Sequence, residues 1–301
     1  MTARKGRLGV SRAADAVVRR LNALSAWVAI VVLGAIFAFL IVNAMKAIRE
    51  LGLGSMIWGT DWYPTTEPPA FGFLPSEVGS LWVTGVALLL AVPIGIAASV
   101  YLSEFAKGRF KETAKSVVEF MAAVPSVVLG LLGLAYVAPV LKSVFGLDSG
   151  LNALTAGIVV GAMSLPTIIS IAEDALYSVP KELRQGSLAL GNTNWQTTYK
   201  VVVPAASSGI FAASMLGLGR AIGETMVVLM LAGNSGLIPS SPLQAARTMT
   251  GTIAQEMGEV VRGGQHYSVL FAMGLVLFAI TFAINLAADV VLERQRKKWR
   301  R

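Results

Sequence analysis

Long apolar stretches alternate with shorter polar segments along the whole chain. Residues 25–45 read SAWVAIVVLGAIFAFLIVNAM, which as a helix is long enough to cross the roughly 30 Å of hydrocarbon in a bilayer. Five similar stretches follow, so the six together cover about 24–46, 79–102, 117–141, 152–172, 206–232 and 267–291. This pattern predicts an all-α polytopic membrane protein with six transmembrane helices.

Basic residues predict how these helices are oriented. The tails 1–24 and 292–301 are both strongly basic, and an even number of helices places them on one side, which the positive-inside rule makes the cytoplasm. The second-to-third connection holds four basic residues, Lys107, Arg109, Lys111 and Lys115. The first-to-second connection holds the acidic residues Asp61, Glu67 and Glu77. We therefore expect the former in the cytoplasm and the latter outside, with the first apolar run retained as a helix rather than removed as a signal peptide.

Composition supports the membrane prediction and removes several other functions. The chain is 55% hydrophobic and 14% charged, whereas soluble domains carry about a quarter charged residues. The net charge of +8 collects at the tails and helix flanks, which favours contact with lipid over nucleic acid. The sequence has no cysteine, and His266, its one histidine, has no ligand spacing and is expected in a loop. We predict no metal, no cofactor and no catalytic site, and without a GxxxxGK[ST] motif any ATP must be bound by another subunit.

Two predicted external loops are too long to be simple turns. The loop from Lys46 to about Val78 contains DWYPTTEPPAFGFLP, a composition that suits either anchoring at the membrane interface or docking of a partner. The loop 233–266 includes MTGTIAQEMGEV, which has helical periodicity.

The predicted cytoplasmic loop 172–204 carries a short helix. Pro180 can start a helix, residues 181–190 alternate polar and apolar groups at roughly helical spacing, and Gly191 with Asn192 offers a left-handed C-cap. A lone short helix is marginal in water, so we expect this one to dock on something. Glu173 and Asp174, just before it, are expected at a solvated helix end.

This loop resembles the signature of binding-protein-dependent ABC permeases, in which Glu-Ala-Ala, three residues and Gly are followed by nine residues and Ile-x-Leu-Pro. Gly191 is followed by nine residues and then VVVP, which ends at Pro204. The triplet is replaced by Gln185, Gly186 and Ser187, which removes its carboxylate. The resemblance implies that Glu182 to Gly191, in a coupling loop of about 173–204, form the helix that docks on an ATPase subunit.

Further segments resemble phosphate permeases of the PstC type: GLGRAIGETMVV at 217–228, EFMAAVPSVVLGLLGL at 119–134 and the run from 71 to 104. The resemblance implies a type I importer permease (MetI-like) fold with its core at 75–291, preceded by a first helix and external loop at 25–74. It also implies a PstA-like second permease, a PstB-like ATPase dimer, a PstS-like binding protein and phosphate as cargo, in a bacterial inner membrane.

Arg220 and Glu224 lie within the fifth apolar stretch, one helical turn apart. An arginine in the bilayer centre is costly and should face the bundle interior. We expect Arg220 to bind phosphate in the pathway, because a guanidinium suits an oxyanion, and Glu224 to neutralise it when the path is empty. A purely structural ion pair is the alternative.

Other features leave alternatives open. Prolines 93, 125, 139 and 166 could be flex points or packing kinks, and Ser126, Ser164 and Thr167 could line a path or bond freed carbonyls. Rival functions are the sister PstA role, a permease for molybdate or sulfate, an ion-coupled secondary transporter, and a scaffold that does not transport.

Overall fold

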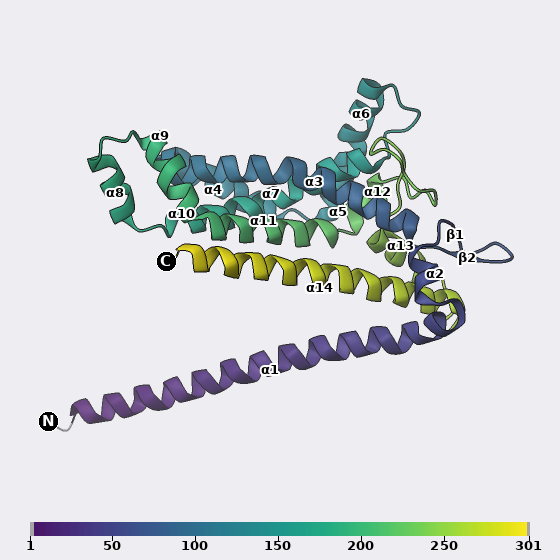
Figure 1. Cartoon of the computed structure of the whole chain (residues 1–301), viewed down its shortest axis with the longest axis horizontal. Coiled ribbons are helices and arrows are strands. Elements are labelled where there is room, and N and C mark those ends of the chain that lie inside the picture. Colours follow the sequence, from purple (N-terminus) through teal and green to yellow (C-terminus); the bar gives the residue numbers. More distant parts are fainter. Residues whose placement is uncertain (1–2, 300–301) are drawn as a thin grey trace.

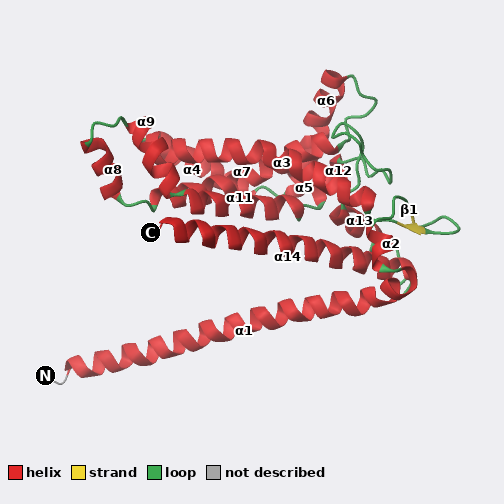
Figure 2. Ribbon diagram, in the orientation of Figure 1, coloured by secondary structure: helices red, strands yellow, loops and turns green. Residues whose placement is uncertain are grey.

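The computed structural model describes the backbone of residues 3–299 and the side chains of residues 17–290 and 293. Helices make up most of it (Figure 2). Within the described residues, five helices are long and apolar enough to cross a membrane: Val17–Leu51, Leu74–Phe105, Ser126–Phe145, Ala153–Tyr177 and Gln265–Val290. The helical pair Asn194–Ala205 and Ser207–Ile222, bent by 69°, makes a sixth if it is counted as one span. The predicted all-α membrane fold is confirmed.

The first and last helices extend well into the basic tails. Helix α1 spans Ala3–Leu51 and α14 spans Gln265–Trp299. They contact each other through ring pairs such as Phe37 with Phe278 and Phe39 with Phe271. Most of the other apolar side chains of α1 are exposed, which suits a helix that faces lipid.

The centre of the bundle is the packing of α3 (Leu74–Val100) against α7 (Ala153–Tyr177). A π-helical turn η1 (Tyr101–Phe105) continues α3. The two helices approach closely at Gly157, where an added Cβ would lie 2.6 Å from the side chain of Val86 and 3.0 Å from the carbonyl oxygen of Val83. Small residues of this kind are what allow membrane helices to pack backbone to backbone. Pro93 and Pro166 lie inside these helices, which continue past them. Ser164 is buried and donates to the carbonyl of Val160 within its own helix, which favours carbonyl bonding over the lining of a path.

The third apolar stretch, predicted as one helix over 117–141, is divided at a proline. Helix α4 (Gly108–Ala123) ends at Val124, which is extended, and Pro125 precedes α5 (Ser126–Leu132). Proline disfavours the helical conformation of the residue before it, which accounts for the break. The chain then continues through a π-helical turn η2 (Gly133–Val137) and α6 (Ala138–Phe145), in which Pro139 lies in the first turn.

Between α7 and α14 the chain forms shorter elements: α8 (Lys181–Ala189), α9 (Asn194–Thr197), η3 (Thr198–Val202), α10 (Val203–Ala205), α11 (Ser207–Ile222), α12 (Met226–Leu231) and α13 (Met249–Glu256). The fifth apolar stretch, 206–232, was predicted as one helix, and the structure breaks it between α11 and α12 at residues 223–225. The periodic segment in the loop 233–266 is helix α13, as predicted.

The long loop after α1 contains α2 (Leu53–Ile57) and a small hairpin. Strand β1 (Trp62–Tyr63) pairs antiparallel with β2 (Ala70–Phe71), with Trp62 opposite Phe71. Trp62 is buried against Phe71 and Phe73, whereas Trp58 is 75% exposed. Trp62 therefore fixes the loop to the protein, and Trp58 remains available to an interface.

Two ends of the molecule can be distinguished in Figure 1. The start of α1 and the end of α14 lie at the same end as α8 and α9, which we call the α8 end. The hairpin, α6, α12 and α13 lie at the opposite end, which we call the hairpin end.

Candidate functional site

Helix α8 forms as the sequence predicts. It begins directly after Pro180, which lies just outside the helix, and its last residue Ala189 is followed by Leu190 as C-cap. Gly191 then adopts φ +84°, a left-handed conformation that glycine takes without steric cost. The short helix and its glycine stop are both confirmed, and they give α8 defined ends.

Ser187 attaches α8 to the segment that follows it. Its hydroxyl is buried, lies 2.9 Å from Oγ1 of Thr197, and accepts a bond of 3.1 Å from the side-chain amide of Asn192. Thr193 and Gln196 form a reciprocal capping box at the start of α9. Glu182, Gln185 and Gly186, by contrast, are exposed. Of the triplet that replaces Glu-Ala-Ala, only the third residue faces inward.

Apolar side chains are exposed on and next to α8, among its exposed polar ones. Leu183, Leu188 and Leu190 are 47%, 43% and 86% exposed, and the aromatic residues Trp195 and Tyr199 nearby are exposed as well. Exposed apolar groups clustered on one short helix are typical of a surface that docks on another protein. These side chains leave α8 with exposed apolar groups, and its docking on a partner stays a prediction.

Pro204 lies where the next segment bends. It belongs to the short α10, Ala206 separates α10 from α11, and the axis turns by 69° there. The predicted second segment therefore ends one residue beyond the proline, at Ala205. The bend directs α11 into the bundle, where it packs on α7 and α3.

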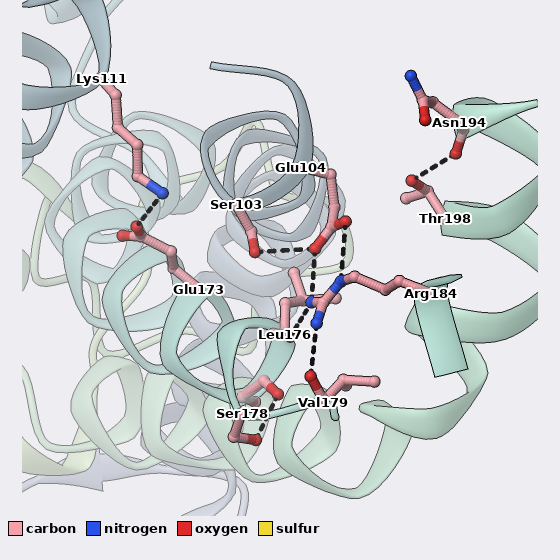
Figure 3. A network of polar contacts seen from close by, with 11 residues as sticks. Ser103, Glu104, Lys111, Glu173, Leu176, Ser178, Val179, Arg184, Asn194 and Thr198 are labelled. Atoms are coloured by element: carbon pink, nitrogen blue, oxygen red, sulfur yellow. Dashed lines mark hydrogen bonds and ion pairs between the residues drawn. The ribbon is translucent and has the colours of Figure 1, made fainter. Parts of the chain in front are cut away.

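Arg184 was not identified from the sequence, and it makes more polar contacts than any predicted residue of α8. Its guanidinium donates to the carboxylate of Glu104 in η1, with NH2 2.9 Å from Oε1 and Nε 3.4 Å from Oε2. NH2 also donates to the carbonyl of Leu176 at 2.8 Å, and NH1 donates to that of Val179. Figure 3 shows Arg184 between the end of α7 and Glu104. The sequence offers one signal for Arg184, its position three residues before Ser187, which places the two side chains on one face of the predicted helix.

Glu173 corrects a sequence prediction. It was expected at a solvated helix end, but its exposed fraction is 5%. Each of its carboxylate oxygens lies 3.6 Å from a lysine nitrogen of α4, Oε1 from Lys111 and Oε2 from Lys115 (Figure 3 draws the first pair). Packing of α4 against α7 covers Glu173 and brings these lysines to it.

Arg220 and Glu224 do not form the predicted pair. Arg220 lies in the last turn of α11 and is exposed, and no side chain in the described part of the chain bonds to it. Glu224 lies in the break, where Oε1 accepts from the backbone nitrogens of Met226 and Val227 at 3.1 and 3.2 Å. Its carbonyl accepts from Thr250 of α13. The break uncouples the two residues, because they no longer share one continuous helix.

A polar cluster closes the hairpin end. Glu256 of α13 accepts from Trp62 Nε1 at 3.0 Å and from Arg247, and its Oε2 lies 2.8 Å from His266 Nε2. Burial acts to raise the pKa of Glu256, but the hydrogen bonds from His266, Trp62 and Arg247 outweigh it, so the pKa lies below its ordinary value. These residues border a cavity of about 470 Å³.

The predicted loop histidine, His266, is instead in the first turn of α14. In the part of the chain that the structure describes, no three histidine, cysteine or acidic side chains gather as metal ligands. The partner of His266 is the carboxylate of Glu256.

Sequence comparisons with known proteins identify the family of this chain. Residues 91–301 match the model of a family described as binding-protein-dependent transport system inner membrane component. The chain is 38% identical to the probable ABC transporter permease protein YqgH of Bacillus subtilis, over 87% of this chain and 85% of that protein. It is 34% identical to the phosphate transport system permease protein PstC of Mesorhizobium japonicum, over 93% of this chain and 90% of that protein.

Solved structures share the fold. One is an inward-facing form of the MetNI methionine ABC transporter, with a TM-score of 0.59 and 20% identity over 74% of this chain and 96% of that one. Another is a bacterial alginate ABC transporter, with a TM-score of 0.59 and 15% identity over 88% of this chain and 93% of that one. The helical spans and a family match over most of the length lead to one conclusion: the chain belongs to the binding-protein-dependent transport system inner membrane component family.

Proposed function

We propose that the chain is the PstC-like permease subunit of an ATP-driven phosphate importer in the bacterial inner membrane. The observation that carries the choice of cargo is the 34% identity, over 93% of the chain, to a protein named as a phosphate transport permease. In this proposal a PstA-like permease completes the pathway, a PstB-like ATPase dimer supplies energy, and a PstS-like binding protein delivers phosphate. In this proposal the chain itself does not hydrolyse ATP.

The proposed orientation has the α8 end in the cytoplasm. Both basic tails belong to helices whose outer ends lie at the same end of the molecule as α8 (Figure 1), and positive flanks favour the cytoplasmic side. The hairpin end then faces outward, where a binding protein could reach α13 and the loops around it. Labelling of single introduced cysteines in intact cells tests this orientation, since the chain has none of its own.

The proposed coupling element is α8 with its exposed leucines. A rigid short helix seated on an ATPase subunit can convert closure of the ATPase dimer into a rigid-body movement of the membrane helices. Ser187 and Gly191 fix the end of α8, so movement of the helix is passed to α9 and onward to Pro204 and the bend.

Arg220 is the proposed phosphate contact. Its guanidinium is exposed on α11 without an ion-pair partner among the described side chains, so its donors are free to take an oxyanion. In the assembled importer we expect a second permease to cover this face and keep lipid away from it. Glu224 then acts on the pathway by holding the start of α12 and the break before it.

Reconstituted complexes purified from the native membrane test this function. ATP-dependent uptake of labelled phosphate is expected, with weak competition by sulfate or molybdate. Arg220→Gln should abolish uptake while leaving assembly and basal ATP hydrolysis unchanged. Arg109→Gln is the matched control, because Arg109 is an exposed arginine of α4.

Several outcomes would replace the proposal. Preferred transport of sulfate or molybdate would identify a different oxyanion importer. Uptake that needs an ion gradient and no ATPase would identify a secondary transporter. Normal phosphate uptake by an assembled Arg220→Gln complex would remove Arg220 from the pathway.

A further inference from the structure

Arg184 occupies the junction of three elements at the α8 end. It belongs to α8, it pairs with Glu104 in the turn that continues α3, and it donates to the carbonyls of Leu176, in the last turn of α7, and of Val179, just after that helix (Figure 3). The arginine and glutamate side chains of this pair are only 21% and 12% exposed. Ser103 adds a bond of 3.1 Å to the same carboxylate, which fixes the position of Glu104.

The chemistry of this junction requires an arginine. A helix ends with carbonyls that have no partner within the helix, and a cation there also meets the negative end of the helix dipole. The planar guanidinium can serve the carboxylate and both carbonyls at once, because its five donors point in fixed and different directions. A lysine ammonium could keep the charge near Glu104 but could not reproduce this set of contacts.

Helix α8 is therefore held at two points with different partners. Ser187 connects it to α9 through Thr197, further along the same chain segment. Arg184 connects it back to α7 and across to η1, the continuation of α3. Exposed residues of α8 such as Glu182, Leu183 and Gln185 take no part in either attachment, so a partner seated on them would act on α8 without displacing either one.

We propose that Arg184 is the positioning residue that makes α8 move as one body with α3 and α7, so that force applied to α8 reaches the centre of the bundle directly. Because α3 and α7 are packed along their lengths, moving their ends moves both helices together. This inference rests on the proposed function, in which α8 receives the movement of an ATPase. It adds a second route for that movement, beside the chain connection through Pro204.

The first test is local and needs neither ATP nor phosphate. Backbone hydrogen exchange of α8 is compared in the purified complex for the wild type, Arg184→Gln, Arg184→Lys and Arg109→Gln. Loss of the junction should speed exchange of α8 amides at least tenfold in Arg184→Gln and less in Arg184→Lys. Arg109, an exposed arginine of α4 outside the proposed docking helix, is the control and should leave exchange unchanged.

The second test measures coupling in the same preparations. Phosphate taken up per ATP hydrolysed should fall tenfold or more in Arg184→Gln, with basal hydrolysis within twofold of the wild type. In Glu104→Gln this ratio should also fall, in Arg184→Lys part of the loss should be recovered, and in Arg109→Gln the ratio should match the wild type. A merely structural role would lower transport and hydrolysis together through loss of assembled complex, without changing their ratio.

The outcomes separate this inference from the proposed function. Unchanged α8 exchange in Arg184→Gln, or faster exchange with an unchanged transport ratio, would overturn the positioning role. A wild-type complex that hydrolyses ATP but takes up no phosphate would refute the cargo, and the exchange comparison would then decide on Arg184 by itself.

Discussion

The two ion pairs of Glu173, with Lys111 and Lys115, predict that removing the carboxylate and removing the lysines cost different amounts of stability. The reason is that the carboxylate is far less exposed than its two partners. The side chains of Lys111 and Lys115 are 30% and 46% exposed, against 7% for that of Glu173. The perturbations are Glu173→Gln, which removes the buried charge, and the double change Lys111→Met with Lys115→Met, which leaves that charge without a partner. Methionine keeps much of the packing of the lysine stems.

The magnitude follows from distance and exposure. Unit charges 3.6 Å apart attract by about 5 kcal/mol at an effective dielectric of 20 and by about 1 kcal/mol in bulk water. In Glu173→Gln the two lysines can regain water, so the cost should be about 1 kcal/mol. In the double lysine change the carboxylate stays buried and uncompensated, so the cost should be about 3 kcal/mol. One lysine change alone should cost little, since the second lysine remains.

Thermal unfolding of the purified protein in detergent measures these differences. The double lysine change should lower Tm clearly more than Glu173→Gln does. Lys107→Met, at an exposed lysine just before α4, is the control and should leave Tm unchanged. If Glu173→Gln were as damaging as the double lysine change, the reasoning from unequal exposure would be refuted.

Three further predictions concern stability. Gly191→Ala should cost about 1 kcal/mol, because a side chain is strained at φ +84°, and should speed hydrogen exchange at the end of α8 while leaving α13 unchanged. Gly157→Ala should cost about 1–3 kcal/mol and lower Tm, since its Cβ would lie 2.6 Å from Val86; an unchanged Tm would show that α3 and α7 can separate freely. The lowered pKa of Glu256 stabilises the folded state fully above the ordinary carboxyl pKa of about 4.3, and this contribution is lost as pH falls through the lower folded value. Melting curves from pH 6 downward should show that loss, and Glu256→Gln should remove this part of the pH dependence.

Local patterns in the sequence were enough for the membrane spans, for α8 and for α13. Each depends on residues within a few turns of one another: apolar runs, a proline at a helix start, and a glycine at a helix end. The two broken stretches mark the limit of this reasoning. Pro125 was recognised as a possible flex point, but whether a proline divides a helix depends on its surroundings, as the continuous helices around Pro93 and Pro166 show.

The polar contacts could not be predicted because their partners are distant in the sequence. Arg184 and Glu104 are 80 residues apart, and Trp62 and Glu256 are 194 apart. Glu173 seemed solvated because its own segment is polar, and the packing of α4 covers it. The predicted pair of Arg220 and Glu224 was wrong although the two residues are close in the sequence. A spacing of four residues brings side chains together only within a continuous helix, and the helix is broken here.

The sequence by itself determined that the chain crosses a membrane, where the short helix α8 lies and which family it resembles, because apolar run length and turn chemistry act locally. Only the tertiary structure decided which charges meet, since a buried charge is stable only beside a partner and the partner is supplied by the packing of another helix.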